Sequence, residues 1–258
     1  TFGALDVSAF EEIPVEVEIA VGERTYVVKD EMNYLFAARM DTPTFDGKDN
    51  EWKGVRAWAI DATKSSDLGQ FHEGAKDMRG DVRVGWNDDY LLFFVRTEDD
   101  VFLQQETGYK TWDWDCVQMG FTKVYRHRNT NNMWLDSLTR CRTELDFALT
   151  KNGPEMFRTM TWDPKGYPKT FIDPDKGKLG IVQRKDADGR TYTNYEIGIK
   201  WEVLGLAKVS PGERLGWAIA LLDQDYLDRT VQIGPSKTGA FALKDPMKFG
   251  MLTLGEAE

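Results

Sequence analysis

Residues 81–97 read DVRVGWNDDYLLFFVRT, and this stretch decides the fold class. Two runs rich in valine, leucine and aromatic residues lie on either side of a polar tripeptide, Asn-Asp-Asp, at 87–89. Apolar runs of strand length on both sides of such a turn are typical of a β-hairpin. The stretch therefore predicts two antiparallel strands joined by a short polar turn.

The same pattern recurs on both sides of this hairpin. Residues 13–19 and 24–29 have alternating apolar positions about a glycine turn and predict an N-terminal hairpin. Further strands are predicted at 114–122, 143–149, 191–200, 214–223 and 249–254. Because no long amphipathic helix separates these strands, they predict an all-β, two-sheet antiparallel sandwich over residues 41–258. Residues 1–40 are then an N-terminal extension that contains the extra hairpin.

Strand alternation also predicts the core. Every second residue of a strand points to the same face of its sheet, so alternating apolar residues mark the buried face. The residues predicted to lie in the core are Val84, Phe93, Val95, Val117, Met119, Phe121, Leu145, Phe147, Ile197, Ile199 and Ile219.

Charge and composition exclude several classes of partner. The chain is 41% hydrophobic and 29% charged, as in ordinary globular proteins, and its formal net charge is −10. A surface of that sign repels phosphate, so neither nucleic acid nor an anionic membrane is expected as a partner. The sequence contains no signal peptide and no apolar run of membrane-spanning length. Cys116 and Cys141 are expected to be free thiols, because one pair defines no disulfide framework.

The face opposite the predicted core has a different composition. If the strands at 114–122 and 143–149 pair, this face combines indoles with amide, guanidinium and carboxylate groups. These groups belong to Trp112, Trp114, Gln118, Arg142, Glu144 and Asp146. A pyranose stacks its C–H face on an indole and bonds its hydroxyl rim to such polar groups, so the pattern predicts a carbohydrate site. The alternative is that the N-terminal hairpin covers this face, with Arg142 paired to Glu144 or Asp146.

Several motifs, in chain order, resemble carbohydrate-binding module family 9 and the wider group of DOMON-like sandwiches. They are TPTFDGKDNEW at 42–52, VRVGWNDDYLLFFVRTEDD at 82–100, WDWDCVQMGF at 112–121, YEIGIKWEVLGL at 195–206, LGWAIALLDQD at 215–225 and DPMKFGMLTL at 245–254. The resemblance implies a non-catalytic module that binds a polysaccharide or oligosaccharide. It also implies a neighbouring catalytic domain in the same full-length chain, and a secreted, cell-surface or periplasmic location.

The resemblance extends to the sugar slot. Trp112 matches the tryptophan of one wall of the slot, and Asp115 also matches. The tryptophan of the opposite wall falls at Leu243, with Phe241 nearby. We therefore expect Trp112 to be the main stacking residue, with Trp114 beside it and Phe241 as a candidate for the second wall.

The polar part of the slot departs from the family. Gln118 stands where the family has a glutamate, Asp146 where it has an arginine and Ala220 where it has a glutamine. The scaffold is therefore expected to be kept while the preference for a particular sugar changes.

The resemblance also implies a structural calcium ion. Two acidic stretches are candidates for its ligands, Asp173-Pro-Asp175-Lys-Gly177 and Asp223-Gln224-Asp225. Neither supplies the oxygen ligands of a calcium loop at the usual spacing, and Asx turns account for both. No metal ligands are predicted.

Three other functions are consistent with parts of the sequence. A spacer that orders a catalytic domain would explain the altered slot. A glycoside hydrolase or lyase needs little more than two carboxylates, such as Glu144 and Asp146, but no catalytic motif is present. A haem-binding electron carrier needs axial ligands, and His72 and His127 are the only histidines.

Overall fold

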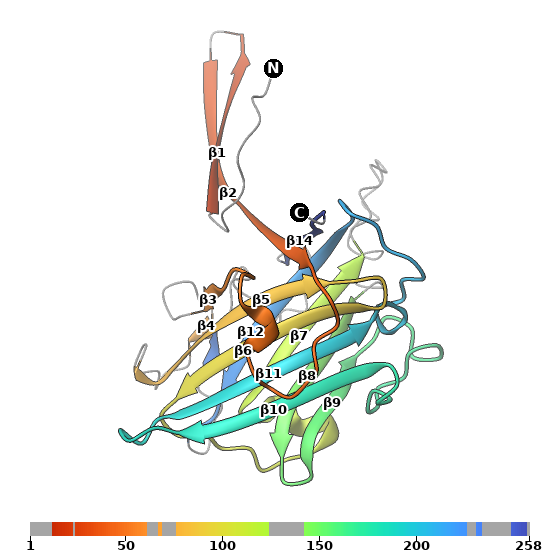
Figure 1. Cartoon of the computed structure of the whole chain (residues 1–258). Helices are drawn as coiled ribbons and strands as arrows, with labels where there is room; N and C mark the ends of the chain where they lie inside the picture. Colours follow the sequence, from red (N-terminus) through yellow and green to blue (C-terminus); the bar gives the residue numbers. More distant parts are fainter. Residues whose placement is uncertain are drawn as a thin grey trace.

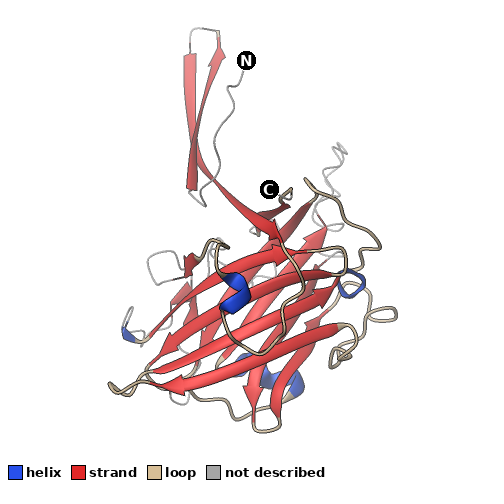
Figure 2. Cartoon of the chain, viewed as in Figure 1, coloured by secondary structure: helices blue, strands red, loops and turns tan. Residues whose placement is uncertain are grey.

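The computed structural model describes residues 12–22, 24–60, 67–68, 76–123, 142–225, 231–233 and 249–256. In these ranges the chain forms β-strands joined by loops and short 3-10 helices (Figure 2). None of the helices in these ranges is long and apolar enough to span a membrane.

The strands in chain order are β1 (Glu12–Val21), β2 (Arg24–Arg39), β3 (Trp58–Ile60), β4 (Asp67–Leu68), β5 (Met78–Trp86), β6 (Tyr90–Asp99), β7 (Cys116–Lys123), β8 (Arg142–Thr150), β9 (Gly153–Met160), β10 (Gly177–Lys185), β11 (Thr191–Lys200), β12 (Arg214–Asp223), β13 (Val231–Ile233) and β14 (Gly250–Leu254). Three 3-10 helices matter for the argument: η1 (Asn50–Trp52), η4 (Gly108–Asp113) and η5 (Trp201–Leu204).

Strand β2 joins two layers into one curled sheet. The strand order is β10-β11-β6-β5-β2-β14-β12-β7-β8-β9, so β2 lies between the layer that contains β5 and the layer that contains β14 (Figure 1). The strand pairs within each layer are antiparallel, but β2 runs parallel to both β14 and β5. The predicted all-β sandwich is confirmed, and these two parallel pairings are a feature that the alternation pattern does not reveal.

Aromatic rings fill the space between the layers. Phe93 of β6 stacks on Trp217 of β12, with ring centroids 5.6 Å apart and planes inclined by 20°. Phe93 also meets Phe121 of β7 at 6.1 Å. All of the residues predicted for the core are buried and belong to this one cluster. The alternation argument is confirmed on both layers.

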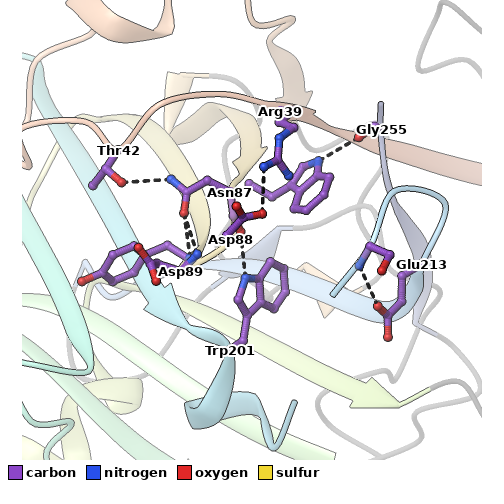
Figure 3. Close-up of polar contacts among 11 residues, drawn as sticks. Arg39, Thr42, Asn87, Asp88, Asp89, Trp201, Glu213 and Gly255 are labelled. Carbon is purple, nitrogen blue, oxygen red and sulfur yellow. Dashed lines mark hydrogen bonds and ion pairs between the residues drawn. The ribbon is translucent and has the colours of Figure 1, made fainter. Parts of the chain in front are cut away.

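The turn at 87–89 forms as predicted. The side-chain oxygen of Asn87 accepts hydrogen bonds from the backbone N–H groups of Asp89 and Tyr90, at 3.0 and 2.9 Å. The Trp201 indole N–H donates to the Asn87 carbonyl at 2.9 Å, which fixes η5 beside the turn (Figure 3). An asparagine that satisfies its own turn explains why the two apolar runs fold back on each other here.

The N-terminal hairpin is confirmed as the pair β1–β2. Gly22 has a φ of 63° at its turn, a left-handed conformation that glycine adopts without strain. The hairpin projects away from the two layers, and β2 then continues into the body of the molecule (Figure 1). Val17, Ile19 and Tyr26 are exposed on it.

The segment that follows β2 is anchored by one buried acid. Glu196 of β11 accepts a hydrogen bond from the Trp52 indole N–H at 2.9 Å and another from the Gly47 backbone N–H at 3.1 Å. Burial raises the pKa of Glu196, and the two hydrogen bonds oppose that rise. The motif at 42–52 is therefore held against β11 by polar contacts as well as by the buried ring of Trp52.

Candidate functional site

The side of β7, β8, β9 and β12 that faces away from the core is called the outer face. Small side chains occupy much of it: Cys116, Ala148, Ala218 and Ala220 pack together with Leu222. Trp112 and Phe249 pack against this cluster from above. Small residues leave room over a sheet for rings or ligands, and here an indole takes part of that room.

The predicted pairing of β7 with β8 is confirmed. Gln118 lies opposite Asp146 in the register, and Thr122 lies opposite Arg142. The Gln118 amide donates to Asp146 Oδ1 at 3.0 Å. The polar residues that the sequence placed on one face therefore do share it.

Helix η4 lies over these polar residues. It contacts β7, β8 and β9. The Thr111 hydroxyl donates to Asp146 Oδ2 at 3.2 Å, and the Thr159 hydroxyl donates to Asp146 Oδ1 at 3.3 Å. Asp146 has no exposed surface and Gln118 has 5%. Asp146 thus holds η4 down on the sheet, and a sugar could reach this carboxylate only if η4 moved.

Arg142 and Glu144 form a buried ion pair on the same face. The Arg142 guanidinium also lies 5.0 Å from the ring centroid of Phe249. The alternative drawn from the sequence expected this pairing under the N-terminal hairpin. In the described ranges the covering elements are η4 and Phe249, whereas the hairpin projects elsewhere (Figure 1).

The two tryptophans of the predicted site are half-buried. Trp112 belongs to η4, and Trp114 follows directly after it, with its backbone N–H donating to the Thr111 carbonyl at 3.2 Å. Phe241 lies outside the described residues, as does the wall position Leu243. Sugar contact by any of the predicted site residues stays a prediction.

The predictions for the cysteines and histidines are only partly covered by the described residues. Cys116 is buried, and its predicted state as a free thiol stays a prediction. Cys141, His72 and His127 lie outside the described residues.

Two groups of three aspartates meet at one end of the sandwich, and the sequence did not predict this. We call the two groups together the acidic end. Carboxylate oxygens of Asp99, Asp115 and Asp223 lie within 4.8 Å of one another. A second group at the same spacing consists of Asp77, Asp100 and Asp225. These aspartates lie at the start of β5 and β7 and at the end of β6 and β12. The four strands are separated in sequence, so only the fold brings the aspartates together. The available signal was an aspartate directly before, or at the end of, each of these strands.

The prediction that Asx turns account for both acidic stretches is confirmed for the stretch at 173–177 and is wrong for the stretch at 223–225. Asp173 does form one, because its side chain accepts a hydrogen bond from the Asp175 N–H at 2.9 Å. Asp223 and Asp225 instead join the acidic end, where β12 brings them beside β6.

Burial and mutual repulsion raise the pKa of these carboxyls. Burial comes first for Asp223, whose pKa rises to about 9, and the neighbouring aspartates add to it. Burial likewise raises the pKa of Asp225 to about 7 and that of Asp99 to about 6. The pKa of Asp115 rises well above its usual value for the same reasons. Such a cluster holds protons or a cation at neutral pH.

The acidic end fits a hard divalent cation. Its donors are all carboxylate oxygens, which calcium prefers. Asp99 Oδ2 and Asp225 Oδ1 are buried and have no hydrogen-bond partner among the described residues. Oxygens left in this state are suited to a metal ion.

Asp115 connects the acidic end to the segment with Trp112. Its carboxylate accepts hydrogen bonds from the backbone N–H groups of Leu103 and Gln224. The Gln104 side-chain amide donates to the carbonyls of Asp115 and Thr111, at 2.9 and 3.2 Å. The backbone on both sides of Trp112 is thereby fixed from the acidic end.

A curled all-β sandwich with a tryptophan over a small-residue sheet face has the features of a carbohydrate-binding module. Residues 45–257 match the model of a family described as carbohydrate family 9 binding domain-like. The match spans most of the chain, so the protein belongs to this family and is a carbohydrate-binding module of that type. The resemblance noted in the sequence is confirmed.

Solved structures share the fold. A family 9 module from Caldicellulosiruptor kristjanssonii in complex with cellotriose is 14% identical, with a TM-score of 0.57, over 88% of this chain and 95% of that chain. The same description with glucose has a TM-score of 0.54 at 14% identity, over 88% and 98%. A putative carbohydrate-binding protein from Bacteroides uniformis has a TM-score of 0.54 at 10% identity, over 86% and 98%. No curated protein matches the chain in sequence.

Proposed function

We propose that this module binds a neutral glycan beside Trp112, and that glucose and β-1,4-linked glucose oligomers are the first ligands to test. The structural neighbours in complex with cellotriose and glucose support this choice of sugars. The net charge of −10 favours neutral chains over sulfated or uronate-rich ones.

The observation that carries the proposal is the position of the Trp112 indole. One side of the ring packs on the small residues of the outer face, and part of it stays exposed. A ring fixed in this way loses little conformational entropy when a sugar stacks on it. Trp114 and Phe241 are the proposed neighbours of the sugar.

The buried polar residues have a supporting role in this proposal. Asp146 holds Thr111 of η4, and Gln118 holds Asp146. Together they fix the helix that presents Trp112. Arg142 and Glu144 support the sheet beneath it, and any hydrogen bond from this group to a sugar hydroxyl would require η4 to shift.

We also propose that the acidic end binds calcium. Asp99, Asp115 and Asp223 are its main ligands, with the second aspartate group beside them. When bound, calcium would supply the positive charge that this cluster of carboxylates lacks. The cation would stabilise the fold and would not contact the sugar.

Titration calorimetry tests the sugar site. Wild-type protein is titrated with glucose and with cello- and xylo-oligosaccharides, and Trp112→Ala is compared with Trp112→Phe. Loss of one stacking ring costs about 1–3 kcal/mol by analogy with bases on aromatic side chains, so Trp112→Ala should weaken binding about tenfold or more. Trp112→Phe keeps a stacking ring and should retain most of the affinity.

Two controls make the result decisive. Tyr26→Ala removes an exposed ring from the distant hairpin and should bind like wild type. Melting curves establish that each variant is folded. Full affinity in folded Trp112→Ala protein would refute the site, and a wild type that binds no glycan would favour the spacer function.

We further propose that the module belongs to a secreted polysaccharide-degrading protein with its own catalytic domain. Membership of a carbohydrate-binding family supports this context, since such modules concentrate a catalytic domain on its substrate. Fractionation of the native host, with an antibody raised against this module, tests the location. Detection only in the cytosol would contradict the proposal.

A further inference from the structure

A second group of aromatic rings lies on the surface close to η4. Tyr109 is 49% exposed and Phe171 is 52% exposed, and both contact Phe157 of β9. Their ring centroids lie 6.4 and 5.0 Å from that of Phe157, both at steep interplanar angles. We call Tyr109, Phe157 and Phe171 the aromatic patch. Its exposed rings are a feature that the site at Trp112 does not use.

The patch is held by main-chain hydrogen bonds. The Ile172 N–H donates to the Met156 carbonyl at 2.9 Å, and the Arg158 N–H donates to the Thr170 carbonyl at 2.8 Å. The segment with Phe171 is thereby fixed along β9. Its ring then lies beside Gly108, where an added Cβ would come within 3.3 Å of Phe171 Cζ. Rings fixed before binding lose little entropy when a ligand covers them.

The patch is continuous with the site at Trp112. Residues three apart in a 3-10 helix lie on the same side of it, so Tyr109 and Trp112 form one column of η4. The rise per residue places them about 6 Å apart along the helix axis, which is close to the length of one pyranose unit. Gly108 and Thr111 form another column, and both make hydrogen bonds to the sheet.

The chemistry around the patch suits a sugar. The Lys169 ammonium lies 5.3 Å from the centroid of the Tyr109 ring, where it can donate to hydroxyl groups. The Glu155 carboxylate holds the Gly108 N–H at 2.9 Å at the base of the patch. Exposed rings with hydrogen-bonding groups at their edges are what a pyranose requires.

We propose that the aromatic patch is a second sugar subsite, which takes a further pyranose unit of the same glycan chain that occupies Trp112. This inference rests on the proposed function, because it needs a sugar at Trp112. It extends that function from the sugar unit at Trp112 to a further unit of the same glycan chain. Continuity with Trp112 through η4 favours a glycan over a protein partner for these rings.

Chain-length dependence tests the subsite. Affinities are measured by calorimetry for glucose, xylose and their β-1,4-linked oligomers up to the hexamer. Wild-type affinity should rise with chain length. Tyr109→Ala and Phe171→Ala should each lower the affinity for the hexamer about tenfold and leave the affinity for the monosaccharide unchanged. Trp112→Ala should lower both.

Matched variants separate the outcomes. Tyr109→Phe keeps the ring and should bind the hexamer like wild type, and Tyr26→Ala removes an equally exposed tyrosine elsewhere. If Phe171→Ala lowers the melting midpoint, the hexamer affinities of Tyr109→Ala and Tyr109→Phe decide whether the subsite exists. Unchanged hexamer affinity in Tyr109→Ala, together with weakened binding in Trp112→Ala, overturns the subsite alone. A wild type that binds neither series overturns the subsite together with the proposed function.

Discussion

Asp115 Oδ1 accepts a hydrogen bond from the backbone N–H of Gln224, with 2.7 Å between the oxygen and the nitrogen. This bond joins the segment that follows η4 to the end of β12. It also places the carboxylate of Asp115 among the aspartates of the acidic end. The part of the chain that presents Trp112 and the proposed cation site are therefore built on the same short stretch of backbone.

Calcium should stabilise the protein. A cation at a concentration a hundredfold above its dissociation constant adds about 2.7 kcal/mol, which for a domain of this size raises the melting midpoint by roughly 5–10 °C. Calorimetric melting with added calcium and with chelator measures the difference. Asp223→Asn should abolish the calcium effect, whereas Asp175→Asn, on an exposed turn, should leave it intact. Identical melting midpoints with calcium and with chelator would exclude the site.

Without a cation, stability should fall as the pH rises. Burial raises the pKa of Asp223 from its ordinary 3.8 to about 9 in the folded protein, so the folded state holds a proton that the unfolded chain has released. The free energy of unfolding in chelator should therefore decrease from pH 5 to pH 8. Asp223→Asn should flatten this slope, and calcium should reverse it because the ionised carboxylates bind the metal. Urea unfolding at several pH values tests the sign.

Phe147→Ala should cost about 3–5 kcal/mol of folding free energy, because the ring is fully buried between the layers and its loss leaves a cavity. Urea denaturation measures the change. Val182→Ala, an exposed position on β10, is the control and should have little effect. A Phe147→Ala protein as stable as wild type would mean that the two faces of β8 are reversed.

Trp52→Phe should cost about 1–3 kcal/mol, because it removes the indole N–H that bonds the buried carboxylate of Glu196. Trp162→Phe changes an indole that is 36% exposed and should be nearly neutral. The comparison is made by urea denaturation. Equal stability of the two variants would show that the Glu196 hydrogen bond contributes nothing.

Local patterns were enough to predict the core, the two hairpin turns and most of the long strands, but β9 and β10 were not predicted. Alternation along β7 and β8 identified Val117 and Phe147 as buried, because the period of a strand is fixed by its backbone. The parallel pairing of β2 with β14 was not predictable in this way. The two strands are far apart in sequence, and alternation says nothing of which neighbour a strand takes.

The sequence predicted which polar residues share the outer face, but it did not predict that they are buried. The sequence placed Gln118 and Asp146 on one face, and the register confirms this. It gave no sign that η4 lies over them, because the cover depends on hydrogen bonds from Gly108 to Glu155 and from Thr111 to Asp146 and on packing of Trp112. The acidic end was not predicted for a similar reason, because Asp99 and Asp223 come together only when β6 and β12 are folded into the two layers.

The parallel pairing of β2 with β14 has a mechanical consequence. Tyr34 lies opposite Met251 and Ala37 opposite Leu254, so neighbouring strands near the two ends of the chain run side by side in the same direction. A pull that draws the two ends apart loads the hydrogen bonds between these strands in shear, all at once and not one after another. If the proposed neighbouring catalytic domain pulls on a glycan-bound module, strands loaded in this way would resist the pull better than strands that separate one hydrogen bond at a time.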